Sequence, residues 1–113
     1  MQGGKYAVGR VGHDDRMSRT PVRLMNDYGA SWPLWRRDGL SDESEWPIST
    51  ELTKRLKAWA AQFDTHFHYE RGWDDPVRCR EHLSEGRELH RRLSEELCPS
   101  FEVTIDLWET NGC

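Results

Sequence analysis

The chain has 113 residues, of which 35% are hydrophobic and 32% are charged, and its formal net charge is −4 at pH 7. This length predicts one domain with a modest core, and the acidic balance argues against a protein that binds nucleic acid through phosphate contacts. No apolar run is long enough for a signal peptide or a transmembrane helix, and no basic block suggests a membrane surface, so we expect a cytoplasmic protein.

Three segments are expected from the composition along the chain. Residues 1–20 combine several glycines with many charges and predict a flexible N-terminal segment. Residues 21–109 predict a single α+β domain, and residues 110–113 a frayed tail. Met17 lies just before the first predicted strand, so translation can also begin there, which makes residues 1–16 dispensable.

The domain opens with a short predicted strand over residues 22–28, because Val22, Leu24 and Tyr28 can share one face. Gly29 then allows a turn of the backbone. Residues 29–48 are expected to form a long loop. Loops of this length without secondary structure are uncommon in compact domains and are often functional.

This loop is the predicted partner-binding site. Tryptophan and arginine are the usual anchors of binding surfaces, and acidic groups steer a basic partner toward them. The predicted surface consists of Trp32, Trp35, Arg36, Arg37, Asp38, Asp42, Glu43, Glu45 and Trp46. The alternative interpretation is that the tryptophans pack on the core of the domain and the acidic groups are simply solvated.

Two helices are predicted next. The first begins near Ser49 or Thr50, either of which can cap it, and runs to about His68, with Gly72 in the following turn. Its apolar stripe is Leu52, Leu56, Trp59, Phe63 and Phe67.

The second helix has a clear start, since Asp75 can cap it and Pro76 suits its first position. Pro99 ends it. Gly86 in mid-helix predicts the close approach of another element. The stripe of this helix is Leu83, Gly86, Leu89 or His90, Leu93 and Leu97.

The final predicted element is a strand from Phe101 to Trp108, in which apolar and polar residues alternate. The predicted architecture is therefore strand, long loop, helix, helix, strand, with antiparallel pairing of the strands and the helices on one face of the sheet. Because two strands alone are marginal in water, we expect a homodimer or a third strand from the N-terminal segment.

A resemblance covers roughly Pro21 to Trp108. The stretch Arg23-Leu24-Met25-x-Asp27-Tyr28-Gly29, followed by Pro33-Leu34-Trp35, resembles a stretch found in small uncharacterised actinobacterial proteins. The Leu52, Leu56 and Trp59 helix and the Glu96-Leu97-x-Pro99 turn fit the same group. The resemblance implies one compact bacterial domain, and it implies no catalytic residue or cofactor.

The candidates for catalysis and metal binding are few. His66 and His68, with carboxylates close by in sequence, are weak zinc or iron ligands, because residues two apart on a helix do not share a face. His82 and Glu85 are three residues apart, which favours a surface hydrogen bond. Asp27, Asp106 or Glu109 at the ends of the strands can serve as a general base, but no partner stands at a recognisable spacing.

The three cysteines are widely spaced, which predicts neither a disulfide framework nor a zinc knuckle. Cys79 and Cys98 are interpreted as small apolar fillers, and Cys113 as an exposed thiol.

Three functions are therefore weighed. The first is a non-enzymatic protein-binding or regulatory domain, such as a toxin-neutralising immunity protein. The second is a small metal-binding protein or enzyme that uses His66 and His68. The third is a self-associating structural protein. The catalytic residues of any enzyme stay unknown, and no cofactor, nucleic acid or membrane is expected as a partner.

Overall fold

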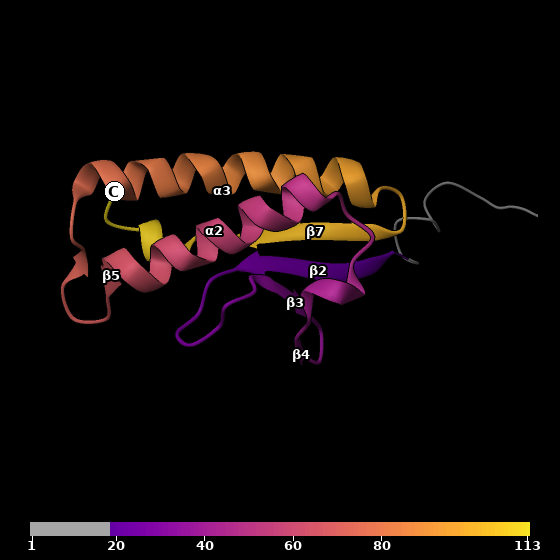
Figure 1. Ribbon diagram of the computed structural model, residues 1–113, viewed down its shortest axis with the longest axis horizontal. Helices are drawn as coiled ribbons and strands as arrows, with labels where there is room; N and C mark the ends of the chain where they lie inside the picture. The colour runs from indigo at the N-terminus through magenta and orange to yellow at the C-terminus, as the bar shows by residue number, and fades with distance from the viewer. Residues whose placement is uncertain (1–18) are drawn as a thin grey trace, which may run out of the picture.

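Two helices lie against a four-stranded sheet in the computed structural model, which describes residues 19–113 (Figure 1). In chain order the elements are β2 (Thr20–Met25), β3 (Leu34–Arg36), β4 (Gly39–Leu40), the 3₁₀ helix η1 (Glu43–Glu45), α2 (Thr50–His66), β5 (Phe67–His68), β6 (Gly72–Trp73), α3 (Pro76–Leu97), β7 (Phe101–Asp106) and the 3₁₀ helix η2 (Trp108–Thr110). The α+β class is confirmed. Most of the predicted N-terminal segment lies outside the described residues, and Thr20 already belongs to β2.

Both helices begin where their capping residues predicted. The side chain of Ser49 accepts a hydrogen bond from the backbone N–H of Leu52, and Asp75 accepts one from Val77, with Pro76 in the first turn of α3. The prediction for Gly86 is confirmed as well, because a Cβ atom there would lie 2.9 Å from the side chains of Leu107 and Trp59.

The sheet has the order β4-β3-β2-β7, and the neighbours β2 and β7, which are its first and last strands along the chain, run parallel. The predicted antiparallel pairing of these two strands is therefore wrong. The reason is β3, which pairs antiparallel with β2 and returns the chain to the end of the sheet at which β2 begins. After this extra reversal, two antiparallel helices bring β7 back in the direction of β2.

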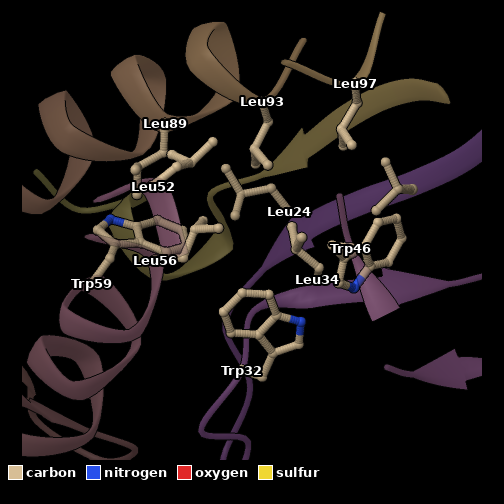
Figure 2. Close-up of a cluster of buried hydrophobic side chains, with 11 residues drawn as sticks. Leu24, Trp32, Leu34, Trp46, Leu52, Leu56, Trp59, Leu89, Leu93 and Leu97 are labelled. Carbon is tan, nitrogen blue, oxygen red and sulfur yellow. The ribbon is translucent and has the colours of Figure 1, made fainter. Parts of the chain in front are cut away.

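The core lies between the helices and one face of the sheet. Val22 and Leu24 point inward from β2, Leu34 joins them from β3, and the leucines of α2 and α3 cover them (Figure 2). The core also contains Trp59, which is 2% exposed. Phe101, Val103, Ile105 and Leu107 pack against this cluster from the C-terminal segment, as their alternation predicted.

The C-terminal tail is held in place, which corrects the prediction of a frayed end. The side chain of Thr110 donates to the carbonyl of Leu107 over 2.8 Å, and Trp73 Nε1 donates to the carbonyl of Glu109 over 2.9 Å. Cys79 and Cys113 form a disulfide with a Cα–Cα distance of 5.9 Å. The interpretation of Cys113 as a thiol is therefore wrong. Cys98 is exposed and has no disulfide partner.

This topology removes the reason for which a homodimer was expected, namely the need for a further strand. A single chain supplies four strands through β2, β3, β4 and β7, so the sheet needs no strand from a second copy. The homodimer stays a prediction. Neither α2 nor α3 is long and apolar enough to cross a membrane.

Candidate functional site

The predicted loop of residues 29–48 is a β-hairpin followed by a turn of 3₁₀ helix. Arg36 pairs with Gly39, which leaves Arg37 and Asp38 at the tip between β3 and β4. Gly39 has a positive φ of 134°, a conformation that favours glycine. The chain then enters η1, capped by Asp42.

Two of the predicted anchors belong to the core. Trp32 and Trp46 are 5% and 6% exposed, and both rings point into the apolar cluster (Figure 2). The indole nitrogen of Trp46 donates to Ser41 Oγ over 2.8 Å, which fixes the turn to the body. The alternative interpretation therefore holds for these two tryptophans, and they are not available to a partner.

Trp35 occupies a different position. Its ring is half-buried, and its indole nitrogen donates to the carbonyl of Met25 over 2.9 Å, so the side chain lies across the sheet. Arg36 stacks on the ring of Trp46 at 4.4 Å and donates to Glu45 over 2.9 Å. The other predicted residues, from Arg37 onward, are exposed. We give the name acidic turn surface to the predicted residues that lie outside the core, which are Trp35, Arg36, Arg37, Asp38, Asp42, Glu43 and Glu45.

Hydrogen bonds and ion pairs hold three of its acidic groups. The hydroxyl and backbone N–H of Ser44 both donate to Asp42 and keep the pKa of that carboxyl below its usual value. The backbone N–H of Asp42, followed by Arg36, lowers the pKa of Glu45. Glu43 pairs with Lys57 at 3.0 Å. The surface therefore carries fixed negative charge near neutral pH.

The structure keeps the histidine candidates for a metal site apart. His66 Nδ1 lies 2.8 Å from Asp74, whereas His68 Nδ1 accepts a hydrogen bond from the backbone N–H of Glu70. Among the described residues, no group of three or more potential ligands comes together. These two histidines serve local hydrogen bonds at the β5–β6 turn.

A buried histidine–glutamate pair is the site that sequence reasoning missed. Nε2 of His82 lies 2.8 Å from Oε2 of Glu109, and both side chains are 0% exposed. The predicted partner Glu85 instead binds Arg55. The ring of His82 stacks on Trp59 at 4.5 Å and lies 4.7 Å from Trp73. A substrate cannot reach these groups, so their role is structural.

The pair also joins four segments of the chain. Nδ1 of His82 on α3 lies 2.9 Å from Oε1 of Gln62 on α2. The side-chain nitrogen of Asn26, just after β2, donates to Glu109 over 2.9 Å. The only sign of this network in the sequence is that His82 comes directly before Leu83, the residue that was assigned to the apolar stripe.

A family model described as Serratia CdiI immunity protein-like matches residues 20–106, from the first residue of β2 to the last residue of β7. The chain belongs to this family. No curated protein matches the sequence. As a member of the CdiI-like immunity family, the chain is a toxin-neutralising immunity protein, and its role is to bind a protein partner rather than to catalyse a reaction.

This result confirms the first of the three functions weighed from the sequence. It also agrees with the inaccessible position of His82 and Glu109. In an immunity protein, the residues that matter for function are those on the surface that meets the toxin. The exposed part of the acidic turn surface is the candidate that the sequence predicted for this contact.

Proposed function

We propose that the chain recognises its toxin through the acidic turn surface. The observation that carries this proposal is the fixed geometry of its charges. Glu45 is held by Arg36 and by the cap of η1, and Glu43 is paired with Lys57 from α2. A surface ordered before binding loses less conformational entropy on association, and its charge steers a basic partner toward it.

Asp38 is the sharpest position for a test. It lies exposed at the tip of the β3–β4 turn and has no ion-pair partner among residues 19–113. Its replacement therefore changes the charge without breaking an ion pair among residues 19–113. Asp42 and Glu45 are less suitable, because they cap η1 and their loss would disorder the turn.

The test uses the toxin that this chain neutralises, identified by its co-purification with the tagged chain. We expect Asp38→Lys to lower the association rate constant for that toxin about tenfold at low salt, because a charge that attracted the partner now repels it. The difference should shrink as salt rises. Asp64→Lys is the matched control, since Asp64 is an exposed carboxylate on α2, away from this turn. Binding kinetics that are identical for Asp38→Lys and the wild type would refute the acidic turn surface.

We also propose that the protein acts in the cytoplasm as a homodimer and has neither nucleic acid nor a membrane as its target. The net charge of −4 supports the exclusion of phosphate-rich partners, because these are bound through clustered basic residues. Failure to protect cells against the co-purified toxin would refute the choice of partner.

A further inference from the structure

The second face of the sheet carries no covering element among the described residues. Val22 and Leu24 of β2 point toward α2 and α3, so Arg23 and Met25 point to the opposite side. Figure 1 shows α3 running alongside β7, with α2 beside it. We call the side away from the helices the open face.

Strand register places four side chains in one row across this face. Trp35 pairs with Leu40 on one side and with Arg23 on the other, and Arg23 pairs with Thr104. The row therefore crosses β4, β3, β2 and β7 in that order. Leu40 is 48% exposed, which makes it one of the most exposed large apolar side chains described.

The charges on the open face are divided between its two sides. Arg23 lies on β2 and Arg37 at the β3–β4 tip, and both are exposed with no ion-pair partner among residues 19–113. Glu102 and Asp106 belong to β7 and alternate with the inward-pointing residues of that strand. A hollow of about 260 Å³ lies between the two arginines, beside Trp35.

This arrangement is complementary to itself. Consider a two-fold axis that is parallel to the strands and lies above the open face, between β2 and β3. The second copy then has its strands in the reverse order across the sheet, and each of its residues stays at the same height along the strands. In such a pair, Trp35 meets Arg23 of the second copy, and Leu40 meets Thr104. Continued two residues beyond Trp35, the β2–β3 register places Arg37 level with Pro21, which pairs with Glu102, so in the dimer Arg37 lies over Pro21 of the second copy with Glu102 beside it. An arginine on a tryptophan ring and an arginine beside a carboxylate are both favourable contacts.

We infer that the open face is the contact between two copies of this chain, formed by face-to-face packing of the two sheets. This inference rests on the proposed homodimer and names its surface. Two sheets packed in this way lie about 10 Å apart with strands nearly aligned. Glu43 of η1 pairs with Lys57 of α2, on the helix side of the sheet, so dimerisation leaves the acidic side chains of η1 accessible to the toxin and covers Trp35 and Arg37 of the acidic turn surface.

Sedimentation velocity of the full chain tests the inference over a range of concentrations. We expect a dimer, and we expect Arg23→Glu to weaken it at least tenfold, because the substitution loses the contact with Trp35. Lys54→Glu is the matched control, since Lys54 is exposed on α2 in the opposite layer, and it should leave the dimer unchanged.

A charge exchange provides the second measurement. Arg37→Glu and Glu102→Arg should each weaken the dimer, and the double variant should restore it, because the opposed pair is re-formed with reversed signs. A circular dichroism spectrum equal to that of the wild type shows that each variant is folded. A wild type that stays monomeric overturns both the homodimer and this surface. A dimer that none of these variants weakens overturns the open face alone and leaves the homodimer intact.

Discussion

At the scale of single residues, the His82–Glu109 pair is the group on which the packing of the domain depends most directly. A polar group removed from water is costly unless it keeps its hydrogen-bond partner, and here the ring also lies between Trp59 and Trp73. The apolar pattern assigned this part of the stripe to Leu83, which is only half-buried. A polar residue inside the stripe could not be recognised, because its partner follows the last strand.

His82→Ala should destabilise the protein by about 3–5 kcal/mol, because Glu109 is left buried without its main partner. Urea unfolding followed by tryptophan fluorescence measures this change. His68→Ala is the control and should cost less than about 0.5 kcal/mol, since that ring lies at the edge of the β5–β6 turn.

A double variant separates the loss of the buried hydrogen bond from the loss of packing. His82→Leu combined with Glu109→Leu fills the same space without these two polar groups and should recover most of the stability lost in His82→Ala. A double variant that is no more stable than His82→Ala would show that shape, rather than the unpaired side chain of Glu109, explains the loss.

At the scale of elements, the long regular segments were predictable and the short ones were not. The caps at Ser49 and Asp75 and the stripes of α2 and α3 follow from spacing over several turns. In contrast, β3 and β4 have three and two residues, too few for alternation to be visible. Because β3 reverses the chain, missing it also gave the wrong direction for β7 relative to β2.

The C-terminal tail depends on a contact that spacing alone did not reveal. Cys79 and Cys113 are separated by 34 residues, and they meet because η2 places the tail against the first turn of α3. A bond between them restricts the unfolded chain over α3 and β7.

Reduction of this disulfide should lower the free energy of unfolding by about 3–4 kcal/mol, as expected for closure of a loop of this length. The measurement is urea unfolding with and without dithiothreitol. Cys113→Ser should match the reduced wild type and lose the response to reductant. Cys98→Ser should keep the full response, because Cys98 takes no part in the bond. Equal stability of the oxidised and reduced wild type would contradict the proposed anchoring of the tail.

At the scale of the whole molecule, the chain separates its stabilising contacts from its candidate contact surfaces. The helices and the inner face of the sheet build the core, while the acidic turn surface and the open face lie outside it. Of the predicted surface, Trp32 and Trp46 were reassigned to the core, because large aromatic side chains gain more from burial than from exposure. The acidic groups stayed outside, since carboxylates are rarely buried without partners.

Toxin capture should therefore depend on pH in a way that follows these carboxylates. The pKa values of Asp42 and Glu45 lie below their usual range, owing to the donors of Ser44 and to the backbone of Asp42 with Arg36. A lowered pKa in the folded state keeps the charged form, and the order of the capped turn, until the pH falls through that pKa. The association rate constant should thus stay constant from about pH 7.5 to 5.5 and fall only below roughly pH 4. Stopped-flow measurements at constant ionic strength check this range, and Asp38→Lys should show the same profile at a lower overall rate. A decline centred between pH 6 and 7 would indicate that a histidine, rather than the acidic turn surface, controls the encounter.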